Sequence, residues 1–346
     1  MPAKKFLLYI SQNYSFAILR PLQAAILARG DEVKWFVKGN DVNMSYFDEN
    51  ELRLATVDDI FNYQPDAIFV PGNLVPSFLP GLKVAVFHGF NVEKRSDSRG
   101  HFNIRGCFDM YCTQGPNTTG PFQSLADEHK FFSVAETGWP AIDPLYDFVP
   151  TEQAKPTILL CSTFSKQLTC APHLFEQVKQ LSASGRWNWL VQFHPKMEKA
   201  IVEQYKSIQS EHLTFVETDN VLPLLQKADV MVCDTSSVLL MFLLLSKPVV
   251  TFKNSNSKNY LIDFDVPSEL EAHIETALSK PDELMQNIEY FREQTHPYTD
   301  GKSAHRVLAA VDERLSGVNN PVKSKPLNFI REMKMRKSLG YWKFWS

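Results

Sequence analysis

The chain has 346 residues, of which 44% are hydrophobic and 22% are charged, and its formal net charge at pH 7 is −3. A chain of this length outgrows one ordinary hydrophobic core and predicts roughly two globular domains. The small negative charge gives no overall attraction to nucleic acid, so we expect no nucleic-acid partner. No stretch reaches the roughly 18 apolar residues of a membrane span, and the apolar run near the amino terminus is too short for a signal peptide.

The cysteines indicate a reducing compartment. There are five of them, an odd number, and none forms a CxxC pair. Cys161 and Cys233 lie inside apolar runs, where a thiol behaves as a small core residue. We therefore expect a cytoplasmic protein.

In the first half of the chain, short apolar runs alternate with helical patterns. The runs predict strands at Phe6–Ile10, Val33–Val37, Ala67–Val70, Val84–Phe87 and Met110–Thr113, with a helix at Ser15–Ala28. Alternating strands and helices of this kind form parallel sheets that are covered on both faces. The GxGxxG fingerprint is missing, which disfavours a dinucleotide-dependent dehydrogenase.

The polar segment 147–156 holds two prolines and separates the two halves, so we place the interdomain linker there. Beyond it the pattern predicts strands at Thr157–Cys161, Trp189–Phe193, Thr214–Val216, Val230–Cys233 and Val249–Phe252. Predicted helices follow at His173–Ser184, Met197–Gln209, Val221–Gln226 and Ser236–Leu245. The expected fold class is α/β, with two Rossmann-like domains that face a cleft, as in the GT-B architecture. We assign residues 1–150 and 151–318 to these domains and 319–346 to a basic aromatic tail.

A polar turn joins one predicted strand to a helix in the second half. It contains Asp234, Thr235, Ser236 and Ser237. The free N–H groups at a helix start, together with the helix dipole, bind phosphate, and such turns lie at the ligand-binding edge of a parallel sheet. The turn therefore predicts a phosphorylated or nucleotide-bearing ligand. The alternative is that these residues merely cap the helix.

Two histidines lie at predicted strand ends, one in each half. His88 precedes Gly89, which allows a sharp turn beside a ligand, and His194 precedes Pro195, which ends the strand. A histidine at such an edge can take a proton from a hydroxyl or bind a phosphate. The alternative for each is a partly buried imidazole bound by backbone groups. We expect His101, His129, His173, His212 and His273, which lie in polar or helical stretches, at the surface.

Two further loops carry candidate phosphate ligands. Thr163 and Lys166 follow the first predicted strand of the second half, although Lys166 is equally explained as a solvated lysine. Asp300, Ser303 and Arg306 surround a predicted helix start, which binds phosphate or is simply capped. No carboxylate cluster demands a metal. We expect no cofactor, although loosely bound Mg²⁺ is compatible with the sequence.

Seven short motifs together resemble one known family. They are VFHG at 86–89, TGWPAID at 137–143, ILLCSTF at 158–164, FHP at 193–195, LLQKADVMVCDTSSV at 224–238, KPVVTF at 247–252 and HPYTDGKSAHRV at 296–307. Their order and spacing resemble the CDP-glycerol glycerophosphotransferase family, the teichoic acid polymerase and primase group with a GT-B fold.

The resemblance implies an enzyme that transfers glycerol phosphate from CDP-glycerol to a hydroxyl acceptor and releases CMP. His88 resembles the family's candidate base, His194 the histidine that contacts the donor phosphates, and Ser236 and Ser237 the serines that bind them. The first domain would take a glycan or lipid-linked acceptor of the cell envelope, and the second would take the CDP-activated polyol. Gly138, within TGWPAID, is a further candidate for substrate binding.

The chain departs from the family pattern beside the phosphate turn. Thr235 occupies a place where the family usually has an aromatic residue, and the segment 239–241 lacks the acidic residue that often follows. Two alternatives therefore stay open: a GT-B nucleotide-sugar glycosyltransferase of surface polysaccharide synthesis, and a non-catalytic paralogue.

The tail at 321–346 combines seven Lys or Arg residues and one Glu with several aromatic residues. This composition suits anionic lipid headgroups, which would place the protein on the inner face of the plasma membrane. The alternatives are a last helix that packs back on the fold, or disorder.

Overall fold

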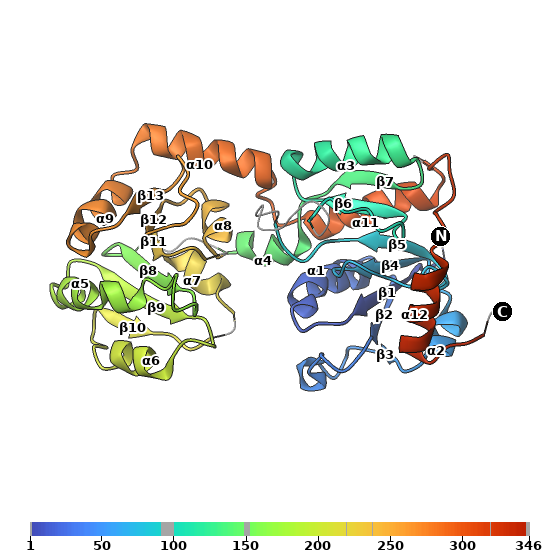
Figure 1. Cartoon of the computed structure of the whole chain (residues 1–346), viewed down its shortest axis with the longest axis horizontal. Helices are drawn as coiled ribbons and strands as arrows, with labels where there is room; N and C mark the ends of the chain where they lie inside the picture. Colours follow the sequence, from blue (N-terminus) through green and yellow to red (C-terminus); the bar gives the residue numbers. More distant parts are fainter. Residues whose placement is uncertain are drawn as a thin grey trace. The chain divides into compact units, whose positions relative to one another are not determined.

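The structure is a computed structural model that describes residues 2–90, 100–148, 153–218, 220–236, 238–318 and 320–343. The chain forms two compact units (Figure 1). The first unit comprises Met1–Tyr146 and Gln294–Ser346, and the second comprises Asp147–Glu293. The expected linker at 147–156 thus begins at the observed boundary. The expected end of the second domain at residue 318 is wrong, because the chain returns to the first unit at Gln294.

The described part of the first unit contains a seven-stranded parallel sheet in the order β3-β2-β1-β4-β5-β6-β7. Its strands are β1 (Lys5–Ile10), β2 (Glu32–Val37), β3 (Arg53–Leu54), β4 (Ala67–Val70), β5 (Leu82–Ala85), β6 (Met110–Thr113) and β7 (Ser133–Glu136). The order reverses between β1 and β4, which is the point where Rossmann-type sheets open for a ligand at their carboxyl edge.

Helices cover both faces of this sheet. They are α1 (Ser15–Ala28), α2 (Val57–Tyr63), α3 (Pro116–His129), α4 (Asp143–Tyr146), α11 (Ser303–Leu315) and α12 (Phe329–Leu339), with 3₁₀ turns η1 (Met44–Tyr46) and η3 (Pro140–Ile142). α1 packs against β1, β2 and α11. Residues of α2 and α3 belong to an apolar cluster on the other face of the sheet. Leu7, Ile68 and Tyr111 belong to the same cluster, and their neighbours along each strand point to the opposite face.

The described residues of the second unit form a six-stranded parallel sheet in the order β10-β9-β8-β11-β12-β13, which has its own reversal between β8 and β11. The strands are β8 (Thr157–Ser162), β9 (Asn188–Phe193), β10 (Leu213–Phe215), β11 (Val230–Cys233), β12 (Val249–Phe252) and β13 (Ile262–Phe264). The helices are α5 (Ala171–Ala183), α6 (Lys199–Lys206), α7 (Leu222–Lys227), α8 (Val238–Leu243), η4 (Pro267–Glu269), α9 (Leu270–Leu278) and α10 (Asp282–Thr295).

The expected α/β class and its two Rossmann-type sheets are confirmed, and every predicted strand has a counterpart. The expected helix at Ser236–Leu245 is shorter, because α8 begins at Val238 and ends in a tight turn after Leu243. A short helix presents fewer aligned peptide dipoles, so its N-terminus is a weaker phosphate site than the sequence suggested.

The described part of the tail packs on the first unit, as one of the alternatives predicted. The Tyr341 ring stacks at 5.4 Å on Phe61 and at 5.7 Å on Phe78, and Tyr341 is only 6% exposed. Lys325 pairs with Asp109 at 2.7 Å. No helix within the described residues is long and apolar enough to cross a membrane.

Candidate functional site

His88 is exposed at the carboxyl edge of the first sheet, just beyond β5. Its Nδ1 lies 3.1 Å from the carbonyl oxygen of Pro71, which follows β4, and its ring lies 5.5 Å from that of Tyr14 in the loop before α1. Because a carbonyl only accepts hydrogen bonds, Nδ1 carries the proton of the neutral ring. Nε2 of His88 therefore keeps a lone pair, which is the arrangement of a general base.

The sharp turn beside His88 is made by Phe87 and not by Gly89. Phe87 has a φ of +59°, in the left-handed region, whereas Gly89 is absent from the positive-φ residues of the described chain. The expected strand at Val84–Phe87 accordingly stops at Ala85. Gly89 contributes its carbonyl oxygen, which accepts a hydrogen bond from Gln114 Nε2 at 3.0 Å.

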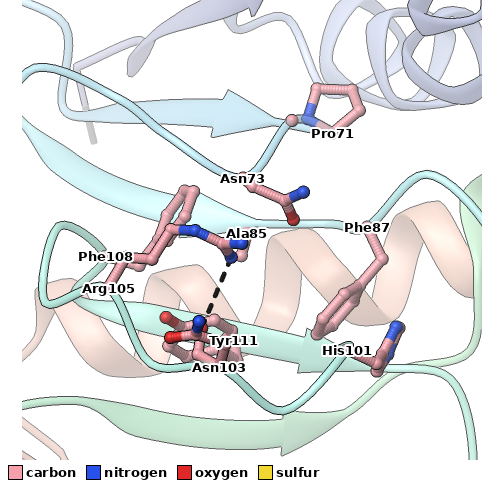
Figure 2. Close-up of a pocket in the computed structure, with 10 residues that line it drawn as sticks. Pro71, Asn73, Ala85, Phe87, His101, Asn103, Arg105, Phe108 and Tyr111 are labelled. Atoms are coloured by element: carbon pink, nitrogen blue, oxygen red, sulfur yellow. Dashed lines mark hydrogen bonds between the residues drawn. The ribbon is translucent and has the colours of Figure 1, made fainter. Parts of the chain in front are cut away.

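A small pocket lies behind Phe87, under the loop that precedes β6 (Figure 2). Its polar lining includes Asn73, His101 and Arg105. His101, expected at the surface, has a buried Nε2 that finds no hydrogen-bond partner among the described residues. Burial, aided by the charge of His88, lowers the pKa of His101 to about 4, so its ring is neutral at pH 7. The polar residues around His101 do not indicate this burial.

In the second unit, Asp234 joins two loops at the reversal of the sheet. Its carboxylate is fully buried and accepts hydrogen bonds from Ser162 Oγ at 2.6 Å, Thr163 N at 3.0 Å and Cys170 N at 3.1 Å. Burial raises the pKa of Asp234, and these hydrogen bonds oppose the rise. The carboxylate is thus engaged by its own chain, where it orders the loop after β8, and the phosphate contact of Asp234 stays a prediction.

The rest of the polar turn is partly occupied by its own chain. Thr235 Oγ1 accepts a hydrogen bond from Ser255 N at 3.1 Å, which ties the loop after β11 to the loop after β12. Ser236 is half-buried, and its N–H donates to the Asp234 carbonyl oxygen at 2.9 Å. Ser237 lies outside the described residues. Ser236 and Thr163 remain the described candidates for phosphate contact here.

His194 is exposed directly after β9, and its hydrogen bond is the reverse of that of His88. Its Nδ1 accepts a hydrogen bond from Lys196 N at 3.0 Å, so the neutral ring carries its proton on Nε2. Partial burial and the charge of Lys196 lower the pKa of His194. The ring of Phe164 lies 4.5 Å away. His194 thus presents an N–H donor, which suits a phosphate oxygen.

Lys166 points to solvent near this histidine. Its side chain is 86% exposed and pairs with Glu198 at 3.5 Å. An exposed pair of this kind is weak, so Lys166 can leave it for a ligand at little cost.

Four further candidates, Gly138, Asp300, Ser303 and Arg306, make contacts within the first unit. Ser303 is buried, its N–H donates to Asp143 Oδ1 at 2.9 Å, and its Oγ lies 3.4 Å from His296 Nε2. Gly138 has a φ of +77°, and a Cβ there would lie 2.5 Å from Ser303 Oγ. Gly138 and Ser303 therefore pack against each other within the first unit, and a side chain at residue 138 would displace the Ser303 hydroxyl.

Arg306 and Asp300 are likewise engaged with their own chain. They form an ion pair, and the guanidinium carbon of Arg306 lies 3.9 Å from the centre of the Tyr298 ring. The hydrogen bond from Arg306 lowers the pKa of Asp300. Both side chains of this turn thus have internal partners, and their substrate contacts stay predictions.

A family model described as CDP-Glycerol:Poly(glycerophosphate) glycerophosphotransferase matches residues 133–313. The chain belongs to this family. The match runs from β7 through the second unit to α11, so it includes His194, the polar turn and the His296 contacts. No curated protein matches this chain.

Solved structures resemble this family member in fold. MnaA of S. aureus, determined with UDP, is 16% identical with a TM-score of 0.62, and the match covers 93% of this chain and 100% of that one. The wall teichoic acid polymerase TagF is 14% identical with a TM-score of 0.62, over 92% of this chain and 90% of TagF. A Listeria monocytogenes protein assigned as a UDP-N-acetylglucosamine 2-epimerase is 15% identical with a TM-score of 0.64, over 94% and 100%. The fold is therefore of the GT-B class.

Metal-binding groups are sparse in the part of the glycerophosphotransferase-family chain that the structure describes. No three His, Cys, Asp or Glu side chains gather there closely enough to hold a metal ion. The described cysteines are buried and free, and burial raises the pKa of the Cys161 and Cys233 thiols.

Proposed function

We propose that this chain transfers glycerol phosphate, or a similar polyol phosphate, from a CDP-activated donor to a hydroxyl of a cell-envelope glycan or polymer, and releases CMP. The family match supports a glycerophosphotransferase. The fold is shared with TagF, of which a structure soaked with CDPG is known.

The opposite tautomers of His88 and His194 carry the proposal. Nδ1–H of His88 donates to the Pro71 carbonyl oxygen, so Nε2 of His88 carries a lone pair. Nδ1 of His194 accepts a hydrogen bond from Lys196 N, so Nε2 of His194 carries an N–H. Phosphoryl transfer to an alcohol requires both a proton acceptor for the hydroxyl and donors for the phosphate oxygens. One histidine of each kind fits this division of labour.

In the proposed step, the acceptor hydroxyl oxygen attacks the β-phosphorus of the donor. Its proton passes to Nε2 of His88, the bond from phosphorus to the CMP oxygen breaks, and CMP leaves with that electron pair. Nε2–H of His194 donates to a phosphate oxygen and offsets the charge that moves onto CMP. Ser236, Thr163 and Lys166 are further proposed phosphate contacts in the second unit.

A donor screen tests the proposed function. The purified full chain is mixed with CDP-glycerol, CDP-ribitol, UDP-glucose or CMP-sialic acid and a short poly(glycerol phosphate) acceptor. We expect CMP release and phosphodiester product with a CDP-polyol. Transfer of a sugar from a nucleotide sugar would support the glycosyltransferase alternative instead, and no nucleotide release from any donor would support the non-catalytic one.

We also propose that the outward side of α12 contacts an anionic membrane. Leu327, just before α12, and Phe329 and Ile330 at its start are 81%, 65% and 69% exposed, whereas Met335 of the same helix is buried. Lys334 and Lys337 are exposed beside them. Exposed apolar and basic residues on one helix suit the headgroup region of anionic lipids.

Vesicle sedimentation tests the membrane contact. Replacement of both Phe329 and Ile330 by Ser should reduce binding to phosphatidylglycerol vesicles at low salt and leave the melting temperature unchanged. Equal binding by the wild type and the double variant would contradict the proposal.

A further inference from the structure

The residue before the candidate base has an unusual backbone conformation. Phe87 has a φ of +59°, a region that large L-residues avoid because Cβ approaches the backbone. Strained residues persist only where the surrounding structure over-determines them, and they concentrate at functional sites. Contacts of the side chain and of the carbonyl hold Phe87 in place.

The Phe87 side chain is held in an aromatic cluster. Its ring stacks on His101 with centroids 4.7 Å apart and planes at 17°, and the two lie side by side in Figure 2. The ring of Phe122 lies 5.3 Å from that of Phe87, nearly edge-on, and 5.9 Å from that of His101. Phe87 itself is only 8% exposed. The side chain therefore cannot swing out to relax the backbone without emptying this cluster.

The Phe87 carbonyl is held separately, by Trp139. The indole Nε1–H of Trp139 donates to Phe87 O at 3.4 Å, and this carbonyl belongs to the peptide that joins Phe87 to His88. The Trp139 N–H in turn donates to His296 Nε2 at 2.9 Å. His296 is 1% exposed, and its Nδ1 donates to Tyr298 O at 2.8 Å, which leaves Nε2 as the acceptor.

We infer that Phe87 and Trp139 are positioning residues for His88, and that they fix the peptide before it so that Nδ1–H meets Pro71 O and Nε2 faces outward. This inference rests on the proposed function, in which His88 is the base. It gives the TGWPAID and HPYTDGKSAHRV segments a role in the reaction through Trp139 and His296, without contact with substrate.

A series at Phe87 separates backbone placement from loss of the ring. Phe87→Gly, Phe87→Ala and Phe87→Val all remove the ring, but tolerance of a positive φ falls from Gly to Ala to the β-branched Val. We expect kcat with CDP-glycerol to fall in the same order, by about tenfold or more between Gly and Val, with KM for the donor unchanged. Equal kcat in folded Gly and Val variants would overturn the inference.

Trp139→Phe removes the indole donor and keeps an aromatic ring. Trp189→Phe is the matched control, because Nε1 of the buried Trp189 has no hydrogen-bond partner in the described structure. We expect kcat to fall about tenfold for Trp139→Phe with donor KM unchanged, and to stay near the wild-type value for Trp189→Phe. A merely structural role would lower the melting temperature of Trp139→Phe without lowering kcat of the folded enzyme.

Nitrogen NMR of histidine-labelled full-length protein gives a readout that needs no substrate. The His88 signal, assigned by its loss in His88→Gln, should report a protonated Nδ1 in the wild type and a tautomer mixture in Phe87→Val and Trp139→Phe. An unchanged His88 tautomer in both folded variants would overturn the inference. Loss of the tautomer preference in a protein that uses no CDP donor would leave the positioning role standing and reject the proposed function.

Discussion

Pro71 and Lys196 present opposite backbone groups to the two candidate histidines, a carbonyl to His88 and an N–H to His194. An imidazole is both acid and base, so its partner at Nδ1 decides which property Nε2 shows. The residue types in the sequence are identical at the two positions, and only the fold distinguishes them. This distinction leads to different expected phenotypes for the two substitutions.

His88→Ala should lower kcat by roughly 10²–10⁴-fold and leave the Kd of the CDP donor unchanged, because the variant loses only the proton acceptor. His194→Ala should weaken donor binding as well, since a donor to the phosphate is lost. Steady-state kinetics and calorimetry measure the two quantities. His305→Ala, at an exposed position on α11, is the control. Near-normal kcat in His88→Ala would remove His88 from the base role.

His101 makes the stability of the first unit sensitive to acid. Its folded pKa is lowered to about 4 from an ordinary 6.5, so between these values the unfolded chain binds more protons than the folded one. The free energy of unfolding therefore falls as pH falls, by about 2 kcal/mol between pH 7 and pH 5. Urea unfolding of the wild type and His101→Gln at both pH values measures this. The same pH dependence in both proteins would assign it to other groups.

At the scale of elements, each sheet is open at the reversal of its strand order, and side chains there tie neighbouring loops together. Asp234 does this in the second unit, where one carboxylate serves the end of β8 and the start of α5. The Asp234 contacts order this carboxyl edge before any ligand arrives. Lys247 acts at the opposite edge, just before β12, where its Nζ donates to the carbonyl oxygens of Leu225, Gln226 and Ala228 at 3.1, 2.7 and 2.6 Å.

Asp234→Asn should lower the free energy of unfolding by about 1–3 kcal/mol, because an amide offers one oxygen to three donors and adds an N–H₂ group without an acceptor. Donor affinity should fall with it if the loop after β8 contacts the phosphates. Lys166→Ala is the matched control for stability, since its side chain is 86% exposed. Urea unfolding and donor calorimetry check both effects. An unchanged free energy of unfolding for Asp234→Asn would show that the buried carboxylate is dispensable.

The strands that sequence patterns missed are edge strands. β3, β7 and β13 end their sheets, and each pairs on one side only. Arg53–Leu54 and Ser133–Glu136 are short and incompletely buried, so they lack the apolar run that marked the inner strands. The strand ends at His88 and His194 were predictable because inner strands carry a continuous apolar run. The φ of Phe87 and its contact with Trp139 were not predictable, because they depend on residues far apart in the chain.

At the scale of the molecule, the tail completes the first unit. Tyr341 fills a slot between Phe61 of α2 and Phe78, and Arg336 lies over the Phe78 ring at 4.1 Å. The basic residues of the tail suggested a membrane surface, but four of them make contacts within the fold: Lys325, Arg331, Arg336 and Lys343. Composition alone does not separate these roles, because both use basic and aromatic residues.

Tyr341→Ala should lower the free energy of unfolding by about 2–4 kcal/mol, through lost apolar burial and the cavity left between two rings. Its neighbour is a matched control: Trp342 is 51% exposed, so Trp342→Ala should change stability by less than about 0.5 kcal/mol. Thermal and urea unfolding measure both. Similar losses for the two variants would mean that the slot does not stabilise the first unit.

The return of the chain at Gln294 has a consequence for synthesis. The boundary falls within α10, an unbroken helix from Asp282 to Thr295, so no change of composition marks it. The second unit is one continuous stretch inserted into the first, so α11 and α12 are made after it although they pack with elements made before it. On the ribosome, the first unit is therefore completed only after the second. Until residues beyond 340 leave the ribosome, apolar surface of α1 and α2 stays uncovered. We expect chaperone binding to be strongest during this period.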